Sequence, residues 1–256
     1  MRIPGRDELL THLPDLRSPA RAALLGLLGL TTFTAATLAM IAVDRAWPAW
    51  TLAGQFAVIA LSALLLAQFF RRKDELLARH GTSAYRRAFV RYVIPAASMI
   101  WAAIIHTAYM PGERVARGRI GVAVAVAGIY LLVTAIILFA RVVSTFGMDN
   151  LAMVYVYTPA GGRLVDSAIY GLIRHPAYSA ACRLGLTIGL WRGTWSSIAF
   201  GLLIPVGLTI WLRAVEEPDL IRRFGTSYES YRRRVPAFAP RLPDVVGFWK
   251  FLLSGK

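Results

Sequence analysis

Long apolar runs without a charged residue dominate this chain. The clearest are residues 22–43 and 49–70, each about as long as the ~20 residues that an α-helix needs to cross the bilayer core. Backbone groups in a bilayer core must be satisfied within the segment, so such runs can fold there only as helices. With 57% of its 256 residues hydrophobic, the chain is also too apolar for an ordinary soluble domain. The sequence predicts an integral membrane protein of the all-α class, a polytopic helical bundle.

The remaining apolar runs extend this bundle to about six helices. Residues 92–110 form a third run, interrupted by polar residues and a proline, and residues 118–140 form a long fourth run. Two shorter runs, 176–191 and 194–212, flank an Arg-Gly pair. We predict that they form a C-terminal helical hairpin, with a kink at Pro205.

The basic residues are distributed unevenly between the ends of these runs. The formal charge is +15, and 23 of the 29 Lys and Arg residues fall in flanks that share one side if the N-terminus is cytoplasmic, against 5 in the opposite turns. The positive-inside rule therefore predicts that both termini are cytoplasmic. Such basic flanks attract anionic lipid head groups, and no nucleic-acid-reading motif accompanies them. The predicted partner is the bilayer, not a nucleic acid.

One ionisable string interrupts the apolar pattern at the start of the hairpin. Arg174-His175-Pro176-Ala177-Tyr178 precedes it, and Glu216-Glu217 follows it. Ionisable groups beside or within a membrane are costly and mark functional sites by default. The four histidines lack metal-ligand spacing, and the single cysteine excludes an intrachain disulfide. We therefore predict a site without a metal.

The same string carries a family resemblance. An Arg-His-Pro-x-Tyr motif with a Leu-Val…Tyr approach (Leu164, Val165, Tyr170) resembles the isoprenylcysteine carboxyl methyltransferase and phospholipid methyltransferase superfamily. The tail adds to the likeness through a Glu-Glu pair, a Phe-Gly-x-x-Tyr-x-x-Tyr string and a proline pair, which are Glu216, Glu217, Phe224, Gly225, Tyr228, Tyr231, Pro236 and Pro240. The resemblance covers about residues 118–241 and implies a membrane methyltransferase that uses S-adenosylmethionine.

The resemblance divides the chain into segments. These are a cytoplasmic N-terminal segment (1–21), N-terminal transmembrane helices with a basic cytoplasmic loop (22–117), a methyltransferase-like membrane core with the cofactor site (118–241), and an amphipathic tail (242–256). A short internal similarity links residues 76–83 to 220–227, where Gly-Thr-Ser ends a basic stretch. Gly is suited to ending a helix, so a repeated local design explains this similarity as well as a duplication does.

Chemistry assigns candidate roles to the motif residues. Arg174 could pair with a carboxylate by two parallel hydrogen bonds, or serve only as a basic anchor at a helix start. His175 could hold the cofactor or handle a substrate proton. We therefore expect Arg174, His175 and Glu216 to be catalytic, and the resemblance implies a cofactor site made of Tyr170, Arg174, His175, Pro176, Tyr178, Glu216 and Glu217.

Several of these residues also have a purely structural interpretation. Pro176 suits a first helical turn, where no amide donor is needed, and Tyr178 could simply pack in the core. The two glutamates could balance nearby arginines, and Pro218 is expected to break the helix beside them. Replacing Glu217 by Gln should weaken cofactor binding and leave folding largely intact.

A second set of residues is predicted to bind substrate. Tyr228 and Tyr231 could close over the site as a lid, or anchor the chain at the membrane interface. Asn150 is assigned only by its position after the fourth run. These assignments complete the predicted site.

The chain departs from the family pattern at three places. Gly162-Arg163 replaces a common His, and Ala168 and Ala180 occupy positions where Gly is common in the family. These departures bear on the substrate more than on the cofactor. The predicted acceptor is a lipid or other hydrophobic molecule, of the phospholipid amine or isoprenylcysteine carboxylate type.

Three alternatives remain open at this stage. They are a small-thiol S-methyltransferase, an NADPH-dependent membrane sterol or enone reductase, and a noncatalytic lipid-binding protein. Two adjacent carboxylates would repel a 2′-phosphate, which disfavours the reductase.

Overall fold

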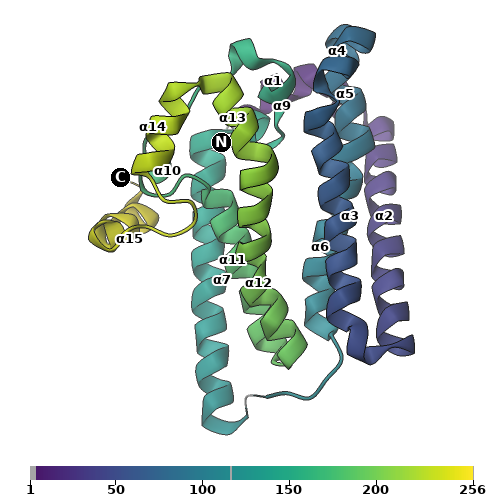
Figure 1. Ribbon diagram of the computed structural model, residues 1–256, viewed down its shortest axis with the longest axis vertical. Helices are drawn as coiled ribbons and strands as arrows, with labels where there is room; N and C mark the ends of the chain where they lie inside the picture. Colours follow the sequence, from purple (N-terminus) through teal and green to yellow (C-terminus); the bar gives the residue numbers. More distant parts are fainter. Residues whose placement is uncertain (1–3, 116, 256) are drawn as a thin grey trace. The chain divides into compact units, whose positions relative to one another are not determined.

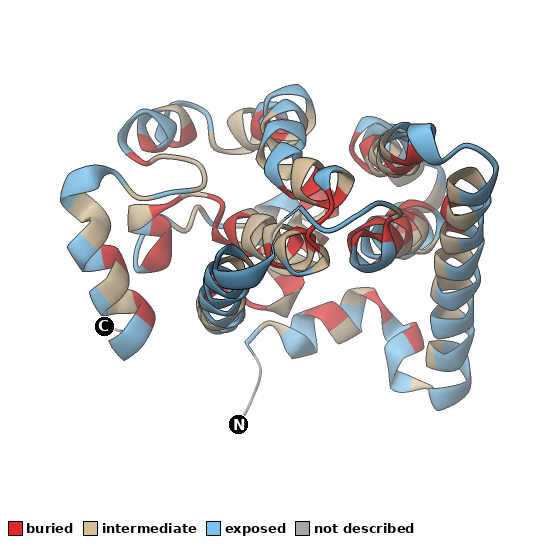
Figure 2. Cartoon of the chain, turned by 90° about the horizontal axis from the view of Figure 1, so that it is seen from below, coloured by how far each residue is buried: buried red, intermediate tan, exposed pale blue. Residues whose placement is uncertain are grey.

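The computed structural model describes residues 4–115 and 117–255, and every regular element within them is helical. This confirms the all-α prediction. The chain forms two compact units: unit 1 comprises Met1–Arg6, Gly118–Thr187 and Gly201–Lys256, and unit 2 comprises Asp7–Arg117 and Ile188–Phe200. Individual helices carry buried residues on one side and exposed residues on the other, as Figure 2 shows.

Five helical segments are long and apolar enough to span a membrane: Pro19–Ala46, Pro48–Arg71, Lys73–Tyr109, Gly118–Phe146 and Trp195–Phe224. Only 11% of the apolar window of the first is buried inside the protein. A surface this apolar suits lipid, because exposing its leucine side chains to water would be energetically unfavourable. The chain is therefore a polytopic helical bundle, as predicted.

Unit 2 is built mainly from the N-terminal helices. In chain order these are α1 (Arg6–His12, whose first residue belongs to unit 1), α2 (Pro19–Ala46), α3 (Thr51–Arg71), α4 (Lys73–His80), α5 (Ala84–Ala88), the π-helix η4 (Phe89–Val93) and α6 (Ile94–His106). Helices α2, α3 and α6 pack against one another (Figure 1). The helical segment that carries the third predicted run begins before it, at Lys73. The arginines just before residue 92 lie on α5 and η4 rather than in the predicted basic loop.

Unit 1 holds the motif residues. Its helices are α7 (Gly118–Phe146), α8 (Met148–Leu151), α9 (Val154–Tyr157), α10 (Ile169–Leu172), most of α11 (Pro176–Arg192) and α12 (Trp195–Trp211), the π-helix η7 (Leu212–Glu216), α13 (Glu217–Phe224), α14 (Thr226–Arg234) and α15 (Val245–Ser254). The short α10 packs against α7 and α15 through a buried cluster that includes Leu138, Ile173 and Phe248. This cluster fixes the segment that leads into the motif.

Helices α11 and α12 form the predicted hairpin, with the turn at residues 193–194. Their close approach depends on glycine: a Cβ built on Gly189 would meet the Ser197 carbonyl oxygen at 2.4 Å, and one on Gly201 would meet the Leu186 Cα at 2.9 Å. Small residues allow helix backbones to approach closely in membranes. Pro205 lies inside α12.

The internal similarity corresponds to the same local geometry in each unit. Gly81 ends α4 with φ 52° and ψ −127°, and Gly225 ends α13 with φ 55° and ψ −136°. This region of φ and ψ is essentially restricted to glycine. The shared Gly-Thr-Ser string therefore marks a helix stop followed by a second short helix.

A buried polar network joins the three packed helices of unit 2. His106 is fully buried; its Nε2 lies 2.8 Å from Asp44 Oδ2 and its Nδ1 lies 2.9 Å from Gln55 Oε1. Gln55 Nε2 donates to the Ala103 carbonyl at 2.7 Å, which fixes the orientation of the amide. His106 therefore faces two acceptors. Satisfying both requires two protons on the ring, or one on the ring and one on Asp44, and either form makes the pair neutral overall.

We expect His106→Ala to destabilise the protein by about 3 kcal/mol or more, because it leaves Asp44 and Gln55 buried without their donor. The measurement is the thermal unfolding midpoint in detergent. His80→Ala is the matched control, since the described structure gives the His80 side chain no hydrogen bond; its midpoint should stay close to wild type. Equal midpoints for the two variants would contradict this role for His106.

Candidate cofactor site in unit 1

The motif lies in an extended link between two helices. Its backbone pairs with the chain after α14: the Arg174 N–H donates to the Pro236 carbonyl at 2.9 Å, and the His175 N–H donates to the Ala237 carbonyl at 3.0 Å. Helix α11 then begins at Pro176, as predicted, because a first-turn residue needs no amide donor. The proline-containing tail therefore holds the motif in place through backbone hydrogen bonds.

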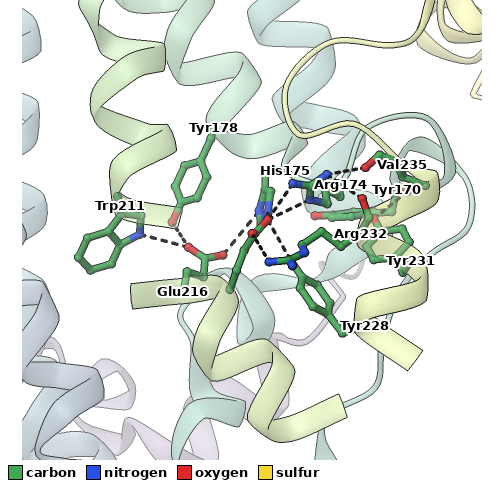
Figure 3. A network of polar contacts seen from close by, with 11 residues as sticks. Tyr170, Arg174, His175, Tyr178, Trp211, Glu216, Tyr228, Tyr231, Arg232 and Val235 are labelled. Carbon is green, nitrogen blue, oxygen red and sulfur yellow. Dashed lines mark hydrogen bonds and ion pairs between the residues drawn. The ribbon is translucent and has the colours of Figure 1, made fainter. Parts of the chain in front are cut away.

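Glu217 is the centre of a polar network with Arg174, Tyr228 and Arg232, three residues that Figure 3 labels. Its side chain is only 4% exposed. Arg174 reaches Oε1 through Nε at 3.0 Å and Nη2 at 2.9 Å, Arg232 Nη1 lies 3.3 Å from Oε2, and the Tyr228 hydroxyl lies 3.4 Å from Oε1. A buried carboxylate needs such pairing, since an unpaired charge would be very costly there. Glu217 thus has a strong structural role.

Arg174 also binds the tail directly. Its Nη1 donates to the Val235 carbonyl at 2.5 Å and to the Arg232 carbonyl at 3.3 Å. The carbonyls at the end of α14 lack intrahelical donors, so a guanidinium satisfies them well. Arg174 therefore links the motif, the acidic pair and the tail, and is more than a basic anchor at a helix start.

Glu216 points to a different set of partners. Its Oε2 accepts hydrogen bonds from the Tyr178 hydroxyl and from Trp211 Nε1, the latter at 3.3 Å. Its Oε1 lies 3.7 Å from His175 Nδ1, and its side chain is 22% exposed. The two adjacent carboxylates thus diverge, as expected from the ~100° step between neighbouring helical residues.

The helix around the acidic pair does not break at Pro218, which contradicts the sequence prediction. The π-helix η7 leads directly into α13, and Pro218 lies in the first turn of α13. A first-turn proline removes no hydrogen bond that the helix needs. The π turn also brings Trp211 and Glu216, five residues apart, onto one face.

His175 lies between the two carboxylates. Its side chain is 7% exposed and stacks on Tyr178, with ring centroids 5.8 Å apart. Its buried Nε2 lies 3.5 Å from Glu217 Oε1 without the geometry of a hydrogen bond. Buried polar atoms are usually satisfied, and the carboxylate of Glu217 is the ion-pair partner of this nitrogen.

The two tail tyrosines are buried inside unit 1. Each is 2% exposed, and the Tyr231 hydroxyl donates to the Tyr170 carbonyl at 2.7 Å. Burial raises the pKa of both Tyr228 and Tyr231, which keeps their hydroxyls protonated as donors. From α14 they support the acidic pair through Glu217 and the approach to the motif through Tyr170, and their contact with substrate stays a prediction.

Two other predicted residues have local partners. The Tyr170 ring packs on Phe146, with centroids 5.0 Å apart, inside the cluster of α7, α10 and α15. The Asn150 amide donates to the Phe146 carbonyl at 2.7 Å and so caps α7. Their assignments to cofactor and substrate stay predictions.

The sequence analysis missed two contributors to the site. Trp211 was overlooked because its i to i+5 relation to Glu216 has no meaning in a regular α-helix. The carbonyl acceptors of residues 232–237 were also missed, since main-chain groups leave no sequence signal. The sequence offered one signal for Trp211, an indole N–H donor five residues before the acidic pair.

Comparison with known proteins adds a family to this geometry. The model of the phospholipid methyltransferase family covers residues 123–227. These residues match that family. The phospholipid methyltransferase segment, as we call residues 123–227, contains the Arg-His-Pro-x-Tyr motif and the acidic pair, and the resemblance predicted from them is confirmed.

A curated relative is also named as a methyltransferase. Methanethiol S-methyltransferase 2 of Bradyrhizobium diazoefficiens is 33% identical over 101 residues, which cover 38% of this chain and 37% of that protein. The match thus spans well under half of the relative. No solved structure matches the chain.

One departure from the family pattern, Ala168, has a strained backbone conformation. Ala168 has φ 53° and ψ −130°, a conformation that L-residues rarely adopt, whereas Ala180 is a buried residue within α11. We expect Ala168→Gly to stabilise the protein by about 1 kcal/mol, because glycine relieves the strain at this φ.

Ala180→Gly is the matched control, with an expected loss of about 1 kcal/mol from the helix interior. Thermal unfolding of both variants in one detergent measures the difference. A lower midpoint for Ala168→Gly than for wild type would show that Ala168 is not strained.

Proposed function

We propose that this protein is an integral membrane methyltransferase that transfers a methyl group from S-adenosylmethionine to a hydrophobic acceptor. The observation that supports it best is the union of Arg174, His175 and Tyr178 with Glu216 and Glu217 across some forty residues of chain, inside the phospholipid methyltransferase segment. The name of the curated relative supports the same reaction class.

The polar groups of the site fit this cofactor. S-adenosylmethionine bears an ammonium and ribose hydroxyls, which need acceptors, and a carboxylate, which needs donors. Glu216 offers a partly exposed carboxylate, and His175 offers a buried nitrogen with no hydrogen bond of its own. When bound, the cofactor supplies an electrophilic methyl group on a good leaving group.

The residues of this chain would then mainly position the reactants. Glu217 pairs with Arg174 and with His175, and so fixes the positions of both side chains. Tyr178 and Trp211 hold Glu216 in one orientation. Fixed geometry and exclusion of water account for most of the rate gain when the leaving group is already good. If the acceptor is an amine or a thiol, His175 is the group placed to take its proton.

The membrane topology of this proposal places both termini and the site in the cytoplasm. The excess of basic residues in the flanks of the apolar segments supports it. Single cysteines introduced at Ser83 and at Ser230 in a Cys182→Ser background should react with a membrane-impermeant maleimide only after the membranes are opened. Labelling of Ser83→Cys or Ser230→Cys in intact cells would contradict the proposed orientation.

Glu216→Gln is the sharper test of the site, because Glu216 is partly exposed whereas Glu217 is buried among two guanidinium groups. Replacing Glu217 by Gln would also disturb folding, contrary to the expectation from the sequence. Loss of one charge-assisted hydrogen bond should weaken S-adenosylhomocysteine binding about tenfold or more. Glu229→Gln, in α14 and outside the network, should bind as wild type does.

The assay measures S-adenosylhomocysteine and NADPH binding by the purified protein, and transfer of radiolabelled methyl to lipid, peptide and thiol fractions of membranes. Binding of NADPH without S-adenosylhomocysteine would refute the proposal in favour of a reductase. Cofactor binding without labelling of any fraction would refute catalysis.

A further inference from the structure

A polar stripe runs along α11 from the motif into the apolar hairpin. His175, Ser179, Arg183 and Thr187 follow at intervals of four residues, so they lie along one side of the helix, about 6 Å apart along its axis. Ser179 donates to the Phe238 carbonyl at 2.5 Å, and Thr187 donates to the Arg183 carbonyl at 2.8 Å. Only Arg183 in this stripe carries a permanent charge.

The Arg183 side chain bends back toward the motif. Its Nη1 donates to the Ser179 carbonyl at 3.1 Å and also to the Ser179 hydroxyl. The guanidinium therefore lies about one turn closer to His175 than its own Cα. It also stands over the Phe248 ring, 5.7 Å from the centroid, a cation–π contact that is strongest when both groups are out of water.

Arg183 differs from the arginines of the site by what it lacks. Arg174 and Arg232 share Glu217, and Arg223 pairs with Asp219. Within the described ranges 4–115 and 117–255, no carboxylate lies within 4 Å of Arg183. Both of its hydrogen bonds use Nη1, which leaves the edge formed by Nε and Nη2 available, the edge that binds a carboxylate or phosphate with two parallel bonds.

We propose that Arg183 binds the anionic group of the hydrophobic acceptor, a carboxylate or phosphate oxyanion on an amphiphile. A cation within an apolar hairpin is costly unless it pairs with an anion or lines a ligand site. The Arg183 guanidinium lies at Ser179, about one helical turn beyond His175. An acceptor whose anionic group binds there would extend from Arg183 toward His175. This proposal deepens the proposed function and rests on it.

Direct binding tests this without requiring methyl transfer. Radiolabelled oleate and dodecyl phosphate are titrated against the purified protein in a neutral detergent, with oleyl alcohol as the uncharged comparison. Arg183→Gln should raise the Kd for both anions about tenfold or more and leave that for oleyl alcohol unchanged. Arg183→Lys should recover only part of the affinity, since a point charge replaces a two-pronged donor.

The matched control is Arg213→Gln, an exposed arginine of unit 1 that, like Arg183, has no carboxylate within 4 Å among the described residues. It should bind both anions as wild type does. Equal anion affinity in wild type and Arg183→Gln, both correctly folded by circular dichroism, would overturn the proposal. Loss of S-adenosylhomocysteine affinity in Arg183→Gln with anion binding unchanged would also overturn it, and would assign Arg183 to the cofactor's carboxylate.

The two proposals fail separately. A protein that binds the anions through Arg183 but transfers no methyl group would refute only the enzymatic function. A protein that transfers methyl groups with undiminished anion affinity in Arg183→Gln would refute only the anion site.

Discussion

The need to neutralise ionised groups inside an apolar bundle governs this molecule. Glu217 is almost fully buried, and it is tolerable there only because Arg174 and Arg232 approach both of its oxygens. That single pairing fixes the motif before α11 against the first turn of α13. The backbone hydrogen bonds from the motif to residues 236–237 follow from the same placement.

The same constraint has a second solution in unit 2. There, Asp44 and His106 form a neutral pair whose remaining ring nitrogen faces an amide oxygen. The network ties three packed helices together. Arg183 contrasts with both cases, since its counter-charge is not supplied by the described part of the chain.

The helical geometry near the site follows from small departures from the α-helix. The π turn before α13 aligns Trp211 with Glu216 and allows Pro218 in the next turn. π turns are common at functional sites because they redirect side chains without ending a helix. A regular helix through these residues would separate the indole donor from the carboxylate.

The sequence by itself determined the class of fold, most of the spans, the hairpin turn and the family resemblance of residues 123–227, because apolar length and motif spacing are local properties of a chain. It also identified the two carboxylates and predicted their divergence, which depends only on the helical step. Only the tertiary structure decided which groups pair, that Tyr228 and Tyr231 are buried supports, and that residues 235–237 hold the motif. Those outcomes depend on contacts between segments tens of residues apart, and on main-chain carbonyls that every residue shares and that no sequence pattern distinguishes.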